Sequence, residues 1–499
     1  MHSVWKTRAD ALPGFGSLEG AVTADTVIIG GGITGVTTAM RLHEAGQRVV
    51  LLEAATIATN NTGGSTGNLY GTVSQGLAQL ARKWNDASVR DAVRLRLDAV
   101  DQIESTVERF GLECGFARRP LHWMIASDDD EWTQRYEDEW TATEKVGLAP
   151  VRLEASALPF GTRRGFLIDG QAQFNPYEYT CLLARALHER GVQIFEASPA
   201  LDIDASEGRV RTDAGEVVGR NIVIATHSPI GFNLVQAEME PCREYGVSAR
   251  LASGDPPQGI FWVRDAGRSL RKYQAGGIDY LVVVGEKHKT GEPEPGVDYP
   301  QRLRSYAEQH YDVARFVHEW SAQQFRSADG LPYIGRSAHD NVYIATGFGA
   351  DGLTWGTVAA ATIDDLIHAR TSVATELLTP RRFTPFKSAK LWWSENAAVV
   401  KHLVGDRLTQ AEVDALSEVP PGEGRIVGLR DGKYAVHRDH DRRLTVLSPV
   451  CPHLKCHVAW NGEAKTWDCP CHGSRFHCDG RVLEGPAKSA LEIVTLPEE

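Results

Sequence analysis

Two short segments near the end of the chain place cysteine and histidine at the spacing of metal ligands. Cys451 and His453 form a C-x-H pair, and after fifteen further residues Cys469 and His472 form a C-x-x-H pair. Together they offer two thiolates and two imidazoles, the set of a structural zinc ion or of a two-iron cluster with imidazoles on one iron. In zinc fingers one segment usually supplies both cysteines and the other both histidines. Here each segment supplies one of each kind, which favours the iron cluster over zinc.

These segments resemble the Rieske [2Fe–2S] domain. The resemblance implies that Cys451 and Cys469 bind one iron and that His453 and His472 bind the other. The cofactor expected here is therefore a Rieske [2Fe–2S] cluster.

Other residues of the same region also match that family. Cys456 and Cys471 match the pair that forms a disulfide in its cytochrome bc-type branch, so the resemblance implies a disulfide clamping the two segments, although disulfides are unusual in the cytosol. Cys478 matches no position of the motif. Ser474 can hydrogen-bond a bridging sulfide, whereas Phe476 stands where high-potential members carry tyrosine. The resemblance therefore implies an intermediate reduction potential.

A glycine-rich turn near the start of the chain predicts a dinucleotide site. Residues 26–29 predict a buried strand, 34–45 a helix and 48–52 a second strand, which together indicate a parallel sheet. The turn between strand and helix has the spacing G-x-G-x-x-G, which allows a tight turn, close approach of a pyrophosphate and close packing of the helix. Glu53 ends the second strand, where its carboxylate can accept hydrogen bonds from a ribose.

The small-residue segment 57–69 then favours FAD over NAD. It resembles the loop that passes the pyrophosphate and flavin edge in FAD-binding oxidoreductases of the D-amino-acid oxidase superfamily, which include sarcosine, glycine and γ-glutamylputrescine oxidases. Segments 200–204, 223–227 and 346–354 resemble the adenine strand, the A-T-G strand end and the closing flavin signature of that family. His227 stands where the A-T-G motif usually has glycine. The likeness covers about residues 20–375.

The resemblance assigns the FAD contacts to residues from each of these segments. They are Gly30, Gly32, Ile33, Thr34, Gly35, Glu53, Ala54, Thr62, Gly63, Ser65, Thr66, Gly67, Asn68, Leu69, Ala200, Thr226, Gly349, Gly352, Leu353 and Thr354.

Three residues are candidates for contact with the substrate. Arg271, by its rough position, is a candidate carboxylate anchor, although an arginine among basic neighbours is also typical of a solvated surface. Tyr245 and His227 are further candidates. The sequence identifies no catalytic acid or base, and hydride transfer from a neutral amine to a flavin mainly requires positioning.

The length of 499 residues corresponds to about three domains of roughly 150 residues. We expect an α/β Rossmann-type FAD-binding domain with an inserted α+β substrate domain, as in D-amino-acid oxidase, and a small all-β C-terminal Rieske domain. The FAD-dependent unit spans 1–375, with FAD-binding segments at about 22–95, 165–230 and 325–375 and substrate-domain segments at about 96–164 and 231–324. A linker follows at 376–422, and the Rieske domain spans 423–499.

Charge and hydropathy exclude several classes of protein. The net charge of −12 disfavours nucleic acid and anionic lipid as partners. From residue 423 onward the chain holds 11 basic and 11 acidic residues, so the FAD-dependent unit carries the whole excess. No apolar run approaches the ~18–20 residues of a membrane span, and residues 1–10 lack a stretch of signal-peptide type. We therefore expect a cytoplasmic protein.

The combination favours an enzyme in which FAD oxidises an amine or amino acid and electrons leave singly through the cluster to an external acceptor. A second hypothesis is an electron-transfer component that supplies a partner oxygenase and whose flavin is reduced by another donor protein or cofactor. A third is a redox sensor or a scaffold stabilised by the cluster. We expect a single dinucleotide site, whereas flavoprotein reductases that use NAD(P)H usually carry one for each dinucleotide.

Overall fold

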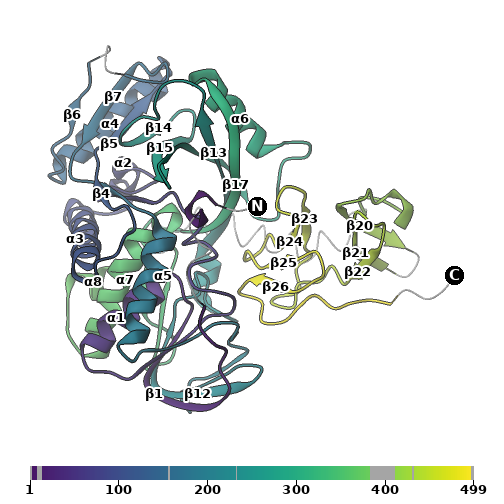
Figure 1. Cartoon of the computed structure of the whole chain (residues 1–499). Coiled ribbons are helices and arrows are strands. Elements are labelled where there is room, and N and C mark those ends of the chain that lie inside the picture. Colours follow the sequence, from purple (N-terminus) through teal and green to yellow (C-terminus); the bar gives the residue numbers. More distant parts are fainter. Residues whose placement is uncertain are drawn as a thin grey trace.

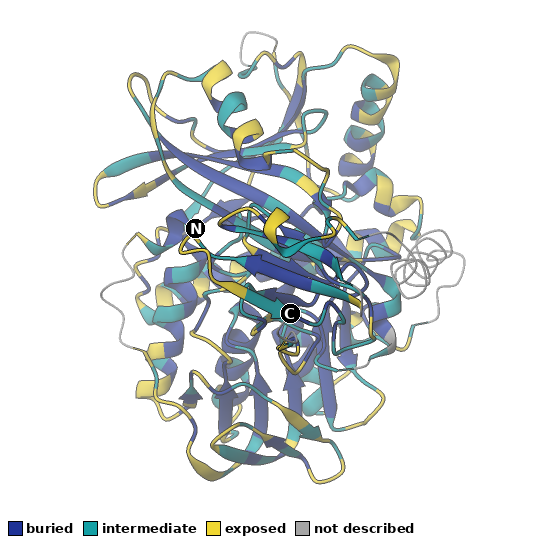
Figure 2. Cartoon of the chain, turned by 90° about the vertical axis from the view of Figure 1, so that its right-hand side faces the viewer, coloured by how far each residue is buried: buried dark blue, intermediate teal, exposed yellow. Residues whose placement is uncertain are grey.

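The computed structural model describes residues 3–7, 14–154, 158–231, 233–382, 411–429 and 432–495. They form three units (Figure 1): a nucleotide unit around a mainly parallel sheet, a large-sheet unit around a mainly antiparallel sheet, and a C-terminal unit whose described residues are 411–429 and 432–495. Figure 2 shows that the central strands are buried along most of their length, while exposed residues gather on the outer helices and loops.

The nucleotide unit has five parallel strands at its centre. Their order is β9 (Gln193–Phe195), β2 (Val49–Leu52), β1 (Gly20–Ile29), β12 (Gly215–Ile224) and β19 (Val342–Thr346). Three antiparallel strands extend this sheet: β10 (Asp202–Asp204), β11 (Arg209–Arg211) and β18 (Tyr333–Arg336). Helices cover one face: α1 (Ile33–Glu44), α3 (Asp86–Phe110), α5 (Pro176–Glu189), α7 (Gly352–Ile367) and the short α8 (Val373–Leu377).

Both faces of this sheet are buried, as expected for parallel strands. Ile28 of β1 packs into the core shared with the helices, while its neighbours Val27 and Ile29 pack into a second core with Phe325 and Tyr333. This alternation follows from the period of two in a strand.

The large-sheet unit contains the inserted segments. Its strands run in the order β17 (Val313–Ser327), β13 (Met239–Leu251), β16 (Ile278–Lys289), β15 (Arg268–Ala275), β14 (Ile260–Val263), β5 (Leu121–Ile125), β7 (Arg164–Ile168) and β6 (Val151–Arg152). Helix α6 (Tyr299–His310) packs on one face of β13 and β16, and α2 (Leu77–Ala81) packs against α4 (Asp130–Lys145). A small sheet of β3 (Asn68–Leu69), β8 (Ala172–Gln173) and β4 (Ala117–Arg118) completes this half of the chain.

The C-terminal unit consists of two small antiparallel sheets. The first contains β20 (Glu423–Leu429), β21 (Gly432–Arg438) and β22 (Leu444–Leu447), and the second contains β23 (Ala459–Asn461), β24 (Thr466–Asp468), β25 (Arg475–His477) and β26 (Val482–Glu484). Trp460, Trp467 and Phe476 pack with the cysteines of the ligand segments into one core. The small unit is therefore built around its cysteine segments.

The predicted fold class is confirmed: an α/β Rossmann-type unit, an inserted α+β unit and a small all-β C-terminal unit. Individual boundaries differ from the sequence expectation. Helix α3 packs on α7, so the nucleotide unit extends beyond residue 95 to Phe110, and β7 pairs with β5 in the large sheet. Helix α7 begins at Gly352, and its glycines allow close packing on α1: a Cβ at Gly356 would lie 2.6 Å from Thr34 Oγ1.

The described ends of the predicted linker pack on the two units that they connect. Leu378 accepts a hydrogen bond from the amide of Ile334 in the nucleotide unit, and the amide of Glu412 donates to Ile426 in the C-terminal unit. Residues 383–410 of the predicted linker lie outside the described residues.

Arg382 forms a buried ion pair whose loss should destabilise the nucleotide unit. Its guanidinium lies 2.7 and 2.9 Å from the two oxygens of Asp329, which has no exposed surface. Arg382→Ala is expected to lower the free energy of unfolding, measured by chemical denaturation, by about 3–5 kcal/mol, because it removes the guanidinium that balances the charge of a buried carboxylate.

Arg381→Ala is the matched control. Arg381 pairs with Asp340, whose side chain is 87% exposed, so its loss should cost at most about 1 kcal/mol. Equal losses of stability in the two variants would contradict the assigned role of Arg382.

Candidate functional site

A cavity of about 730 Å³ lies at the carboxyl ends of β1, β2 and β12. Its lining includes the glycine turn after β1, the loop 56–66, the segments 199–201, 225–230 and 345–353, the wall formed by β13, β16 and β17, and residues 481–490 of the C-terminal unit. Ligands of open α/β sheets bind outside the carboxyl ends of the strands, so the cavity lies where a dinucleotide is expected.

The glycines of the turn are required by close backbone contacts. Gly30 has φ +110°, and a Cβ there would lie 2.5 Å from the carbonyl oxygen of Ala225. A Cβ at Gly35 would lie 1.9 Å from the carbonyl oxygen of Gly30. The turn therefore brings the N-terminus of α1 to the cavity wall, where its amide groups favour a pyrophosphate.

Glu53 is held at the end of β2 by two amide donors. Its carboxylate oxygens accept hydrogen bonds from Gly31 N at 2.7 Å and from Ala55 N at 2.8 Å. Burial raises the pKa of Glu53, and the two amide donors oppose that shift. The carboxylate lines the cavity, as a ribose acceptor must.

A second glycine turn faces the same cavity. Residues 347–352 repeat the spacing G-x-G-x-x-G between β19 and α7, a second copy that the sequence analysis missed. Asp351 fixes this turn: it accepts hydrogen bonds from Tyr70 Oη at 2.8 Å and Ser74 N at 3.0 Å, and lies 3.7 Å from the buried Arg96. Because both turns line one cavity, the repeat does not form a separate dinucleotide site.

Most of the predicted FAD contacts line this cavity. They are Gly30, Gly32, Ile33, Thr34, Glu53, Ala54, Thr62, Ser65, Thr66, Ala200, Thr226, Gly349, Gly352 and Leu353. Outside its lining lie Gly35, Gly63, Gly67, Asn68, Leu69 and Thr354, which pack beside the lining residues. The cavity, the amide groups of α1 and the acceptor Glu53 fit FAD.

His227 lines the cavity in the conformation that explains why glycine is usual at this position of the motif. Its φ is +68°, the left-handed region that glycine adopts most readily. Its Nδ1 lies 2.9 Å from Asn61 Nδ2, and burial lowers the pKa of the imidazole to about 4. His227 is therefore neutral at pH 7.

The other two substrate candidates differ in position. Tyr245 lines the cavity, but its hydroxyl lies 3.0 Å from His288 Nε2 and its ring stacks on Tyr299 of α6. Arg271 is buried outside the lining, and its guanidinium donates to the carbonyl oxygens of Thr66 and Gly67. The expected role of Arg271 as a carboxylate anchor has no support in this geometry, because its donors hold the FAD loop.

The sheet wall contributes residues that the sequence analysis missed. Glu244, Trp320 and Gln324 line the cavity, and Gln324 Nε2 donates to Glu244 Oε2 at 3.1 Å. The apolar alternation of Tyr245, Val247 and Ala249 is the signal that could have predicted β13. Nothing in the sequence shows which face of that strand meets the cavity.

The four expected cluster ligands meet in the C-terminal unit. Cys451 and Cys469 are buried with their thiols in hydrogen-bond contact, and the rings of His453 and His472 are 5.0 Å apart. His453 Nε2 and His472 Nδ1 are buried and lack a hydrogen-bond partner among the described residues. Two adjacent thiols and two adjacent imidazoles with unused nitrogens fit a [2Fe–2S] cluster in which the thiols bind one iron and the imidazoles bind the other.

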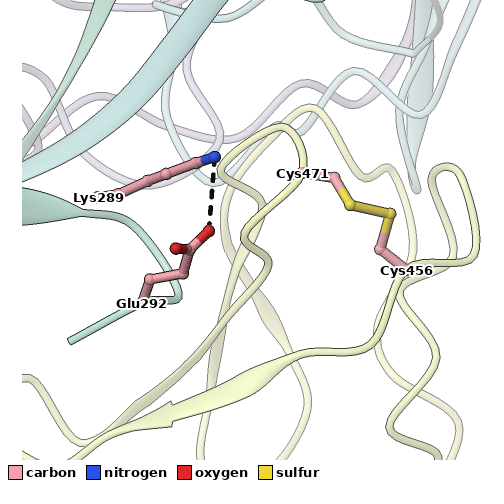
Figure 3. The surroundings of a disulfide bond; sticks show 4 residues. All are labelled: Lys289, Glu292, Cys456 and Cys471. Atoms are coloured by element: carbon pink, nitrogen blue, oxygen red, sulfur yellow. Dashed lines mark ion pairs between the residues drawn. A yellow bond between two sulfur atoms is a disulfide. The ribbon is translucent and has the colours of Figure 1, made fainter. Parts of the chain in front are cut away.

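The expected disulfide is present. Cys456 and Cys471 are bonded and connect the two ligand segments. Figure 3 shows this bond close to the large-sheet unit, where Lys289 and Glu292 form an ion pair. A Cβ at Gly291, between those two residues, would lie 2.7 Å from the amide nitrogen of Pro470, so the cluster segment packs directly on this loop.

The C-terminal unit also forms part of the cavity. Val482, Glu484 and Lys488 are among its lining residues. Arg243 of β13, whose side chain is 2% exposed, lies 3.9 Å from Glu484, which also pairs with Arg475. The cavity is therefore bounded by all three units.

Comparisons with known proteins agree with both sites. The family described as FAD dependent oxidoreductase matches residues 25–366, and the family described as Rieske [2Fe-2S] domain matches residues 409–495. The chain belongs to the FAD-dependent oxidoreductases and carries a C-terminal Rieske domain; its cofactors are FAD and a [2Fe–2S] cluster.

Several known proteins are similar to this chain in sequence or in fold. The putative Rieske 2Fe-2S iron-sulfur protein YhfW of Bacillus subtilis is 31% identical, over 99% of this chain and 98% of its own. Gamma-glutamylputrescine oxidoreductase of Escherichia coli is 22% identical, over 73% of this chain and 88% of its own. Glycine oxidase from Geobacillus kaustophilus has the same fold, with a TM-score of 0.59 and 18% identity over 72% of this chain and all of its own. Among the described residues, no helix is long and apolar enough to cross a membrane.

The disulfide predicts the pattern of thiol labelling. In denatured, unreduced protein, we expect an alkylating reagent to modify Cys478 and the other free cysteines but neither Cys456 nor Cys471, measured by peptide mass spectrometry. After reduction, both should be labelled. Full labelling of both before reduction would show that the bond is absent.

Phe476 predicts a cluster potential below the top of the Rieske range. Ser474 and Phe476 are fully buried beside the ligand segments, and phenylalanine offers no hydroxyl to a cluster sulfur. A redox titration followed by electron paramagnetic resonance should give a midpoint below about +300 mV, and Phe476→Tyr should raise it. A wild-type midpoint at that upper value would refute the prediction.

Proposed function

We propose that the protein oxidises an amine or amino acid at FAD and passes the electrons through its Rieske cluster to an external acceptor. When bound, FAD takes up an electron pair from the substrate, and the cluster carries electrons one at a time. The observation that carries this proposal is the shared cavity: FAD-fingerprint residues and residues 482–488 of the Rieske domain line the same space.

The charge of the sheet wall supports an amine as the donor. Of the described residues on β13, β16 and β17 that line the cavity, Glu244 is the charged one. A carboxylate there attracts an ammonium group, which amines and amino acids both carry. Gln324 holds one oxygen of Glu244, Oε2, and so orients the carboxylate at the cavity wall.

The remaining lining residues position the donor and exclude water. Trp320 Nε1 donates to the carbonyl oxygen of Gly64 at 2.9 Å, which fixes its ring against the FAD loop. Val284 and Phe325 add apolar surface to the same wall. Such a wall holds a carbon atom in place, which is the main requirement for hydride transfer.

An electron-transfer component for a partner oxygenase is the second candidate. The same docking of the Rieske domain on the cavity favours it, since electrons can cross that contact in either direction. A cytoplasmic location stays a prediction from the sequence.

Anaerobic bleaching of the flavin separates the two candidates. We expect a primary amine or an amino acid from a substrate panel to bleach the flavin absorbance faster than NADH or NADPH. Glu244→Gln should weaken binding of the effective amine at least tenfold, about 1.4 kcal/mol, measured from the perturbed flavin spectrum.

Glu240→Gln is the matched control, since Glu240 lies on the same strand and pairs with Arg326 outside the cavity lining. Rapid bleaching by NADH, with none by any amine or amino acid, would reject the first candidate in favour of the second.

A further inference from the structure

One side chain connects the flavin cavity to the cluster segment. Gln323 lines the cavity from β17, and its Nε2 donates to the carbonyl oxygen of Gly473 at 2.8 Å. Gly473 directly follows the cluster ligand His472. Gln323 is 3% exposed, so this hydrogen bond is formed away from water.

Each polar group of Gln323 has a defined partner. Its backbone amide donates to Asn61 Oδ1 at 2.9 Å, and its side-chain oxygen accepts from Thr290 Oγ1 at 3.0 Å. Asn61 belongs to the FAD loop, and Thr290 follows β16 in the large-sheet unit. The backbone of Gln323 is therefore held by the FAD loop and its side-chain amide by Thr290, which orients Nε2 toward Gly473.

The surroundings of Gly473 leave no room for a side chain at this position. Gly473 has φ +74°, and a Cβ there would lie 2.9 Å from Pro241 Cβ and 3.0 Å from Gln323 Nε2. The backbone of the cluster segment thus packs directly on β13 and β17.

A second contact lies on the neighbouring strand. Arg243, which approaches Glu484 of the Rieske domain, is the direct cross-strand partner of Gln323 in the pairing of β13 with β17. Two adjacent positions of one sheet therefore hold the Rieske domain, and Gln323 is the one that contacts the cluster segment.

We infer that Gln323 is a positioning residue for electron transfer between the flavin and the cluster. It holds the His472–Gly473 backbone at the cavity wall and supplies a hydrogen-bonded route from that wall to a cluster ligand. Electron tunnelling weakens steeply with distance and with each gap through space, so loss of this bond should slow transfer without changing either cofactor. The inference rests on the proposed function, because it assumes that electrons pass between the two sites within one chain.

Flash photolysis of the complete holoprotein tests this role without a known substrate. The photochemically generated 5-deazariboflavin radical reduces one cofactor, and absorbance then follows equilibration between flavin and cluster. In the wild type we expect a rate independent of protein concentration. Gln323→Met, which keeps the volume but loses both side-chain hydrogen bonds, should lower this rate at least tenfold, with the midpoint potentials of both cofactors unchanged.

Two further variants keep the test decisive. Gln323→Leu also lacks a donor to Gly473 and adds no charge beside the cofactors, so it should also slow equilibration if the methionine variant fails to fold. Gln75→Met is the matched control, because Gln75 Nε2 donates to another glycine carbonyl, that of Gly330, at 2.9 Å and lies outside the cavity lining. It should equilibrate at the wild-type rate.

The outcomes distinguish this inference from the proposed function. A wild-type rate that rises with protein concentration, or no equilibration at all, would reject transfer within one chain. A concentration-independent rate that is the same in wild type and both Gln323 variants would overturn the role of Gln323 alone.

Discussion

The arrangement of the two redox sites depends on a buried charged contact between the Rieske domain and the large sheet. Arg243 projects from β13 toward Glu484, and Arg475 joins Glu484 to Asp468. A buried charge without its partners costs several kcal/mol, so these residues favour one docked position. That position brings Gly473 against Pro241 and Gln323, and residues 482–488 against the FAD cavity.

Covalent fusion reduces what this contact must supply. Linking two modules converts their association into an intramolecular step with a high effective concentration, so a modest interface suffices to keep the domains docked. The interface can then be specialised for position rather than for affinity. Its polar contacts fit that purpose: Gln323 and Gly231 each bind one backbone group of the Rieske domain, at Gly473 and Pro486.

The sequence predicts those features that depend on short spacing along the chain. The glycine turn with Glu53 and the ligand segments with Cys451 and Cys469 each lie within a few tens of residues, so their spacing, together with the resemblance to known families, identifies them. Glu244 and Gln323 could not be identified in this way, because their roles depend on strand pairing and on domain docking. Arg271 illustrates the converse: its position along the chain agrees with a substrate anchor, but its guanidinium is occupied by carbonyl groups of the FAD loop.

The electrostatics of the cavity distinguish the two candidate electron donors. NADH and NADPH carry negative phosphates and need a glycine turn of their own, whereas both glycine turns at strand ends, at 30–35 and 347–352, line the one FAD cavity. Among the described sheet residues of the lining, Glu244 is the charged one, and it attracts a cationic donor; Arg481 and Lys488 line the Rieske side of the cavity. Docking of the Rieske domain fits either direction of electron flow, so it is this wall that favours an amine as the source of electrons.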